Sequence, residues 1–274
     1  MKILCKKHFM SFKYYLLVVI LLLLTSDAFA EDFLKTLEDG SVEEKIEAMY
    51  NTGYAGNKAV FWYFVKYLSY TPKNGDNQLA IRCREAAAEG LGRINDKRAI
   101  PYLIEQYKKE KNIAVKRKIM FAFRRYRDAE IIPLVEDAIS SSDPDLRFQG
   151  VMTASFSNNE DYAVKVSQLL ENEKDSTVKL AGIYCLANIG SDFDNNFSQL
   201  LKALHQKEPE LRYWAAQFIR VIDNPKGIDD LVKALEIENK IWVRNEMELA
   251  LSTLYVSRKA NSDYYNNDYL KQKD

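Results

Sequence analysis

The fold is decided by the stretch between residues 83 and 104, which reads CREAAAEGLGRINDKRAIPYLI. Small or apolar side chains follow Arg84 at three, four, six and seven positions, which is the spacing of one face of an α-helix. Asp96 then interrupts the pattern as a turn residue, and Ile100 and Leu103 begin a second apolar face. The stretch therefore predicts two short helices joined by a tight turn.

The same pattern recurs along the chain at a regular interval. When Arg84 is taken as the anchor of its repeat, similar segments have their own basic anchors. Successive anchors lie 39, 32, 31, 32, 33 and 32 residues apart. A fixed period of this length is the signature of a repeat protein, whose short units bury their apolar faces by stacking on one another. The anchors are Lys45, Arg84, Lys116, Arg147, Lys179, Arg212 and Arg244.

Turn and capping residues lie where hairpins of two helices require them. Proline occurs three residues before two anchors, at Pro144 and Pro209, and proline favours the first position of a helix. Residues that favour turns or helix caps occur twelve positions after five of the anchors. They are Asp96, Asp128, Asn159, Ser191 and Asn224. Each repeat is therefore predicted to be a helical hairpin without any strand.

The segment from Arg84 to Ile104 resembles the HEAT repeat, most closely the short type first noted in phycobilisome lyase subunits. It follows that consensus nearly residue for residue, as Arg-x-x-Ala-Ala-x-Gly-Leu-Gly and then Asp-x-Arg-Ala-Ile-Pro-x-Leu-Ile. The likeness covers about residues 41–258 and is weakest at both ends. The resemblance implies an all-α, right-handed α-α superhelix, a HEAT-like α-solenoid of about seven helical hairpins.

The resemblance also implies a structural role for the most regular positions. In this family the basic anchor and the turn aspartate stabilise the stacking of repeats and are not catalytic. That role would fall on the seven anchors and on Asp96 and Asp128, which match the turn position. Asn159, Ser191 and Asn224 depart from it, so a ladder of ion pairs is expected to be interrupted there.

The first thirty residues differ in character from the repeats. Four lysines among the first thirteen residues precede an uncharged run over residues 14–24, and Ala28-Phe29-Ala30 offers the small side chains that signal peptidase accepts. A signal anchor is the less favoured alternative, because this run is shorter than the roughly 20 residues that span a bilayer. We expect a signal peptide over residues 1–30, cleavage after Ala30, and a periplasmic or secreted protein that meets the membrane only during export.

The domain organisation follows from these boundaries. A solenoid domain is expected over residues 31–258, after the signal peptide. The first repeat carries an insertion from Ser69 to Gln78 that has the composition of an exposed loop. Residues 259–274 form a polar, tyrosine-rich tail, which we expect to be frayed or disordered.

The charge of the chain argues against a nucleic-acid partner. The whole sequence has 39 basic and 39 acidic residues, and removal of residues 1–30 takes away four lysines and Asp27 to leave 35 and 38. DNA- and RNA-binding proteins normally present a basic face. A role like that of the HEAT-like DNA glycosylases is therefore disfavoured, and no nucleic acid is expected as a partner.

The inventory of reactive side chains is poor. Outside residues 1–30 the chain has one histidine, His205, so histidine-based metal sites and Ser-His-Asp triads are hard to build. Cys83 and Cys185 occupy core-facing positions three repeats apart, too far for a disulfide, and are expected to be buried thiols. We therefore expect no catalytic residues, no metal and no cofactor, and hence no enzyme.

The remaining candidate for function is a binding surface. The resemblance implies that the second helices line the concave side of the stack, where polar and charged side chains would suit a peptide or protein. The candidate positions are Tyr102, Glu105, Gln106, Lys165, Gln168, Gln199, Lys202, Asp230 and Lys233. Aromatic residues favour interfaces, but the cluster between Phe61 and Tyr67 can equally pack the end of the stack.

Two functions from different classes fit these observations. The first is an exported binding or scaffold protein that engages a protein partner through its extended repeat surface. The alternative is a lyase-like or maturation factor that attaches a cofactor, since phycobilin lyases have this type of repeat. The fold alone supports that alternative, and the predicted export signal weakens it.

Overall fold

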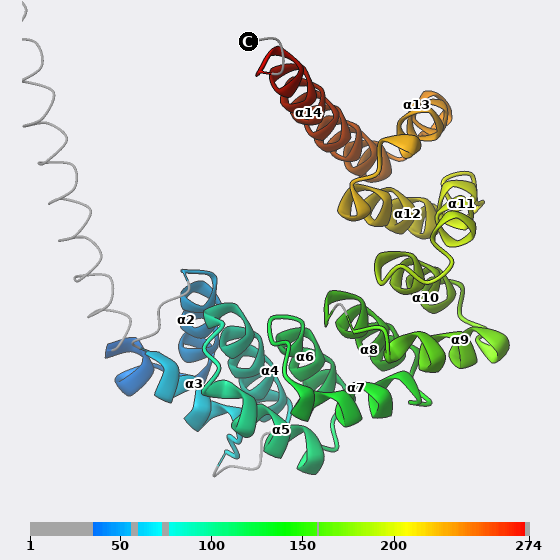
Figure 1. Ribbon diagram of the computed structural model, residues 1–274. Helices are drawn as coiled ribbons and strands as arrows, with labels where there is room; N and C mark the ends of the chain where they lie inside the picture. The colour runs from blue at the N-terminus through cyan, green and yellow to red at the C-terminus, as the bar shows by residue number, and fades with distance from the viewer. Residues whose placement is uncertain (1–34, 56–59, 73–76, 158, 272–274) are drawn as a thin grey trace, which may run out of the picture. The chain divides into compact units, whose positions relative to one another are not determined.

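The computed structural model describes residues 35–55, 60–72, 77–157 and 159–271, and these residues form helices and connecting loops without a strand (Figure 1). The predicted signal peptide lies outside the described residues. So do residues 73–76, in the middle of the loop expected between Ser69 and Gln78. The chain divides into two compact units, Met1–Ala122 and Phe123–Asp274, which we call unit 1 and unit 2.

Unit 1 is built from the first repeats. The second helix α3 packs on α4 and contacts α5, and the first helices α2 and α4 are in extensive contact. The helices are α2 (Val42–Ala55), α3 (Phe61–Leu68), α4 (Asn77–Ile94), α5 (Ala99–Lys109) and α6 (Ile113–Phe123), whose last residue belongs to unit 2.

Unit 2 continues the same alternation of first and second helices. Its first helices are α8 (Pro144–Ser157), α10 (Ser176–Asn188), α12 (Pro209–Ile222) and α14 (Ile241–Lys271). Its second helices are α7 (Ile132–Ile139), α9 (Tyr162–Asn172), α11 (Phe193–Ala203) and α13 (Ile228–Ile237). Short 3-10 turns, η2 (Ala129–Ile131) and η3 (Pro225–Gly227), lead into α7 and α13.

Small residues let neighbouring helices approach closely, as the sequence predicts. A Cβ atom added to Gly92 would lie 2.5 Å from Cα of Ala122, and one added to Gly150 would lie 2.8 Å from the backbone nitrogen of Ile139. Backbone cannot withdraw as a flexible side chain can, so a larger residue at either glycine would push the helices apart.

Four of the five predicted turn residues stabilise the turn that leads into a second helix. Asp96, Asp128, Asn159 and Asn224 each accept a hydrogen bond of 3.0 Å on a side-chain oxygen, donated by the backbone N–H two residues later. An amide oxygen accepts this bond as a carboxylate oxygen does, so asparagine and aspartate serve equally here. In the remaining turn Asp192, next to Ser191, takes a left-handed conformation with φ 44°.

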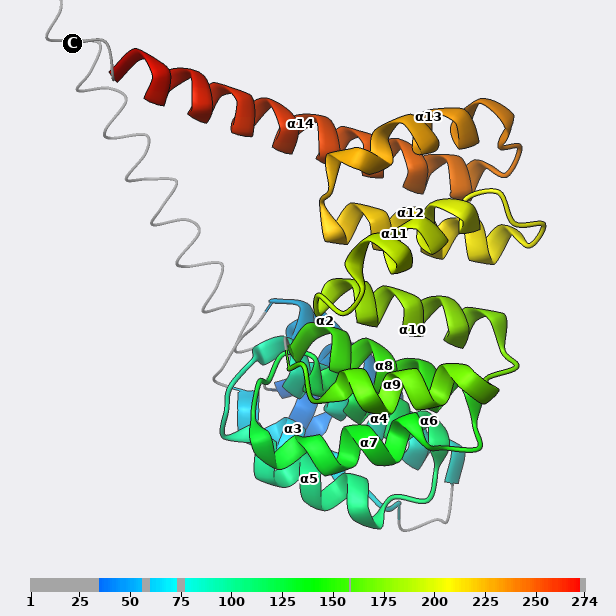
Figure 2. The same ribbon diagram turned by 45° about the vertical axis from the view of Figure 1, so that its right-hand side comes forward.

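The last repeat differs from the predicted seventh hairpin. A single helix, α14, runs from Ile241 to Lys271, so its backbone stays helical through most of the segment expected to be frayed. The position twelve residues after Arg244 holds Val256 rather than a turn residue, and nothing else there breaks the helix. Figure 2 shows α14 extending well past α13.

The bend of unit 2 places its first helices on the inner side. Figure 1 shows α8, α10, α12 and α14 along that side, with α9, α11 and α13 outside them. Phe148 of α8 and Trp214 of α12 touch across α10, with ring centroids 5.0 Å apart, as only helices on the inside of a bend can. The expectation that the second helices line the concave side is therefore wrong for unit 2.

Candidate functional site

Three of the arginine anchors are held by glutamates at the ends of the second helices. Arg147 donates from Nε and Nη2 to the carboxylate of Glu173, at 2.7 and 2.9 Å. Arg212 binds Glu238 in the same way, at 2.6 and 3.0 Å. Arg84 pairs with Glu110 at 2.9 Å. We call each arrangement an Arg–Glu clamp.

Each clamp fixes two linkers between repeats. The Nη1 group of Arg212 donates to the carbonyl oxygens of Gln206 and Lys207, in the linker that enters its repeat, at 2.8 Å each. Glu238 accepts hydrogen bonds from the backbone N–H groups of Asn239 and Lys240, in the linker that leaves the repeat. The arginine of every second repeat therefore contacts the linker before its repeat directly and the linker after it through the glutamate.

The clamps lower the pKa of their carboxyl groups. Hydrogen bonds from Arg212 and from backbone N–H groups hold the pKa of Glu238 at about 2, and those from Arg147 lower the pKa of Glu173. The Glu238 side chain is only 1% exposed. Charge-assisted, bidentate pairs of this kind are among the strong hydrogen bonds of proteins. These three arginine anchors therefore join the linkers around their repeats, and they pair with these glutamates rather than with the turn aspartates.

The lysine anchors differ from the arginine anchors. The ammonium group of Lys116 lies 4.5 Å from the centre of the Tyr107 ring, a cation–π contact. Lys179 is exposed, and within the described part of the chain its ammonium group has no carboxylate within ion-pair distance. The linker after its repeat, residues 204–208, is two residues longer than the linker at residues 173–175 and lacks a glutamate at its start.

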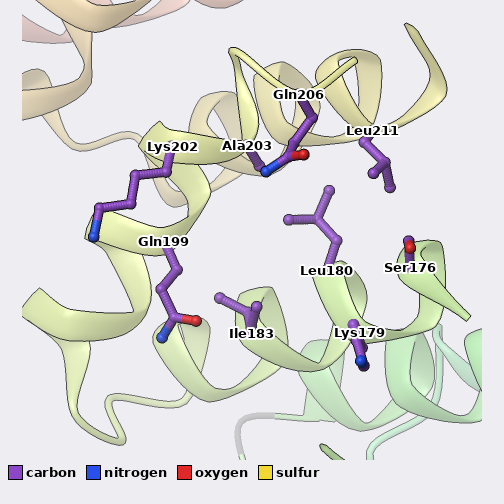
Figure 3. Close-up of a pocket in the computed structure, with 9 residues that line it drawn as sticks. All are labelled: Ser176, Lys179, Leu180, Ile183, Gln199, Lys202, Ala203, Gln206 and Leu211. Atoms are coloured by element: carbon purple, nitrogen blue, oxygen red, sulfur yellow. The ribbon is translucent and has the colours of Figure 1, made fainter. Parts of the chain in front are cut away.

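A cavity opens beside this lysine anchor. It has a volume of about 310 Å³ and lies between α10, α11 and the start of α12. Figure 3 shows an apolar floor with amide and ammonium groups around it. The residues that line it are Ser176, Lys179, Leu180, Ile183, Gln199, Lys202, Ala203, Gln206 and Leu211.

A row of aromatic side chains comes from the first helices of unit 2, which Figure 1 shows on its inner side. Phe148 and Trp214 touch at 5.0 Å between ring centroids, Trp214 and Tyr213 at 5.6 Å, and Tyr213 and Trp242 at 5.4 Å. Trp242 is 43% exposed and the other three are partly exposed. We call these four residues the aromatic row, which reaches from α8 to α14.

The structure places the predicted surface residues in several separate locations. Gln199 and Lys202 line the cavity together, and Gln168 lies in a shallow pocket beside Arg147. Glu105 and Lys233 are exposed, and Lys165 and Asp230 are partly buried on α9 and α13. These positions lie on outer helices in unit 2, so they do not form one inner surface there.

Two predicted surface residues belong to the packing of unit 1. Gln106 is buried, with 6% exposure, and its amide donates a hydrogen bond to Glu110 at 2.8 Å. The expectation that it is exposed is therefore wrong. Tyr102 is half-buried between Phe61 and Trp62, at 6.5 and 6.1 Å between ring centroids. Most of the early aromatic cluster thus packs the core, while Trp62 is 57% exposed.

The reactive residues lie where the sequence predicts. Cys83 and Cys185 are fully buried free thiols, and burial raises the pKa of each to about 12. His205 is exposed. Among the residues that the structure describes, no cluster of three His, Cys, Asp or Glu side chains is arranged for a metal ion.

No helix in the described ranges combines the length and the apolar character that crossing a membrane requires.

The clamp glutamates were not predicted, although the sequence carries a signal for them. They lie 26 residues after their arginines in all three cases, as Arg84 with Glu110 and Arg147 with Glu173 show. The aromatic row was harder to find, because its rings come from positions with different spacing in each repeat.

Comparisons with known proteins agree with this architecture. The family model described as HEAT repeats matches residues 102–187 and 164–252, and the model described as PBS lyase HEAT-like repeat matches residues 84–108. A comparison with curated protein sequences found no match.

A solved complex has the same fold. The complex of CpcE and CpcF of phycocyanin lyase from Nostoc sp. PCC7120 matches with a TM-score of 0.63 and 14% identity, covering 81% of this chain and 93% of that one. Human deoxyhypusine hydroxylase matches with 19% identity over 81% and 83% of the two chains, and an engineered protein with 16% over 82% and 96%. Their TM-scores of 0.37 and 0.32 are too low to add evidence.

The likeness to the phycocyanin lyase complex shows the fold alone, because the identity is low, and it does not transfer that complex's activity. The HEAT model, by contrast, matches more than half of the residues, and the described helices pack as stacked hairpins. The chain therefore belongs to the HEAT-repeat family.

Proposed function

We propose that this chain is an exported repeat scaffold that binds a protein partner on the inner side of unit 2. The aromatic row is the observation that carries this proposal. Its rings are ordered against one another, yet Trp242 keeps 43% of its surface exposed. Partly exposed aromatic side chains on a rigid surface are frequent anchors of protein interfaces, because they bury a large area at a small cost in conformational entropy.

The last two repeats also carry exposed apolar side chains. Ile237 and Ile241 are each 74% exposed, and Leu249 on α14 is 50% exposed. A contiguous group of exposed apolar residues typically marks an interaction site. Their exposure leaves these side chains available for a partner.

Export is supported by the sequence at the start of the chain. The basic leader, the short apolar run and the motif at residues 28–30 together favour a cleaved signal peptide. Mass spectrometry of the protein from its native cells tests this proposal directly. A mature chain that begins at Glu31 would support it, and an uncleaved chain in the cytosol would refute it.

Binding can be tested by crosslinking and affinity capture from the native envelope with the mature chain. We expect a defined protein partner to be captured, and to be lost in the double variant Tyr213→Ala/Trp242→Ala. Trp62→Ala, which removes an exposed tryptophan from unit 1, is the matched control and should retain the partner. Failure of the unaltered chain to capture any protein would contradict the proposal.

A further inference from the structure

We propose that the cavity between α10, α11 and α12 is a socket for an aliphatic side chain with carboxylates on either side, presented by an extended segment of the protein partner. This inference rests on the proposed function and specifies the chemistry that the partner must carry. It follows from the charges at the rim of the cavity, from its floor, and from comparison with the equivalent place in the clamped repeats.

The rim of the cavity is positively charged. Lys179 of α10 and Lys202 of α11 are both exposed, and the nine lining residues include no carboxylate. In the part of the chain that the structure describes, neither ammonium group forms an ion pair. Uncompensated charges on a concave, partly apolar surface attract groups of the opposite sign more strongly than charges on an open surface do.

The floor of the cavity is apolar. Leu180, Ala203 and Leu211 are 5%, 6% and 8% exposed and form a largely buried layer, and Ile183 lies beside them. A volume of about 310 Å³ is at the lower limit for ligand pockets, which suits one side chain rather than a whole cofactor. The floor therefore selects an aliphatic side chain.

The arrangement of the polar groups favours a peptide over a simple anion. Figure 3 shows the two lysines on separate edges, with Leu180 and Ile183 between them and with Gln199 and Gln206 also at the rim. An extended segment can present a carboxylate to each edge, because alternate side chains of a strand lie on the same side, and its backbone can bond with the rim amides.

The clamped repeats show what is different about this cavity. The pocket of about 280 Å³ beside Arg147 is lined by Glu173, which the arginine binds, whereas no carboxylate lines the cavity beside Lys179. Beside Arg147 and beside Arg212 a guanidinium and a buried glutamate occupy the junction of successive hairpins. At Lys179 the longer linker after α11 brings no glutamate into this place. The partner's carboxylates would supply the negative charge that the chain itself provides in the clamped repeats.

The test measures binding of defined peptides to the purified mature chain by fluorescence anisotropy. The probe is a fluorescein-labelled peptide of sequence GSESLSEGS, whose leucine and two glutamates lie on the same side when the peptide is extended. The controls are GSQSLSQGS, without the carboxylates, and GSESSSEGS, without the aliphatic group. We expect saturable binding of the first peptide alone. Absence of binding up to about 1 mM, or equal binding of all three, would overturn the proposal.

Variants locate the binding. The double variant Lys179→Glu/Lys202→Glu should weaken binding of the first peptide by about tenfold or more. Arg125→Glu/Arg127→Glu changes the same charge at exposed positions of unit 2 that do not line the cavity, and should leave binding unchanged. All four side chains are exposed, so the variants should fold, which circular dichroism can verify. If both double variants lost the same affinity for the first peptide, the effect would come from net charge alone, and the socket proposal would be wrong.

The two proposals fail in different ways. If the unaltered chain captures its protein partner but the peptide does not bind, the socket is wrong and the scaffold function stands. If the peptide binds at the cavity but no protein partner is captured, the scaffold function is wrong and the socket remains as a site for acidic peptides.

Discussion

The repeats anchored by Arg212 and by Lys179 are neighbours in unit 2 with the same helical hairpin, but the junctions that follow them are stabilised differently. At Arg212 a guanidinium joins two linkers through a glutamate that is 1% exposed and two backbone carbonyls. At Lys179 the same place is a cavity with an exposed ammonium group at its rim. The family fold fixes the place, and the anchor residue and the linker after the repeat decide whether a guanidinium and a glutamate meet there.

The contacts of the clamps also explain why a clamp is needed only in every second repeat. Each clamped arginine contacts the linker before its repeat and, through its glutamate, the linker after it, as Arg147 does with Ser141 and Glu173. A lysine repeat between two clamped repeats therefore has both of its linkers held by its neighbours. The lysine anchor therefore does not have to hold a linker, and it is available for binding.

Removal of the clamp should have the largest effect. Arg212→Ala leaves the buried carboxylate of Glu238 without its partner, and we expect the free energy of unfolding to fall by about 3 kcal/mol. Urea denaturation followed by circular dichroism measures this. Lys179→Ala is the matched control and should change stability by less than about 0.5 kcal/mol. Equal losses in the two variants would contradict the distinction between the repeats.

Acid should remove the same stabilisation gradually. The folded pKa of Glu238, about 2, lies below its ordinary value of 4.5, so the clamp contributes fully above about pH 5 and is lost as the pH falls through 4.5 toward 2. Over that range we expect the unaltered chain to lose about 2 kcal/mol more than Arg212→Ala does. Urea denaturation at a series of pH values tests this, and parallel curves for the two proteins would show that the clamp does not set the pKa.

The sequence predicted the features that the repeats have in common. A constant period and a periodic apolar face identify stacked hairpins, and a turn residue such as Asp96 marks the end of a first helix, because each of these features depends on local spacing. The buried thiol of Cys185 was predictable for the same reason, since the repeat places it on the core face.

The irregular part could not be predicted in the same way. The cavity depends on a linker that is two residues longer and on a missing glutamate, which matter only once α11 and α12 are placed beside α10. The contact between Phe148 and Trp214 crosses an intervening helix, so it depends on the curvature of unit 2. Burial of Gln106 depends on its contact with Glu110, four residues later, at the clamp of Arg84.

A smaller effect is expected when the clamp keeps its charge but loses its shape. Arg212→Lys retains one positive charge but cannot form two parallel hydrogen bonds with Glu238 and also reach the linker carbonyls. We expect a loss of about 1–1.5 kcal/mol, measured by urea denaturation as for the alanine variant. A loss as large as that of Arg212→Ala would mean that geometry alone, and not charge, holds the junction.

The reverse exchange should have the smallest effect. Lys179→Arg introduces the fork of a clamp into a repeat whose linker offers no glutamate, and Glu173, at the preceding linker, is already bound by Arg147. The new guanidinium would remain at the rim of the cavity in water, where an exposed charge adds little to stability. We expect the free energy of unfolding to change by less than about 0.5 kcal/mol, measured alongside Arg212→Lys. A gain above about 1 kcal/mol would show that the linker carbonyls alone can hold an arginine, and would transfer the stabilising role from the glutamate to the backbone.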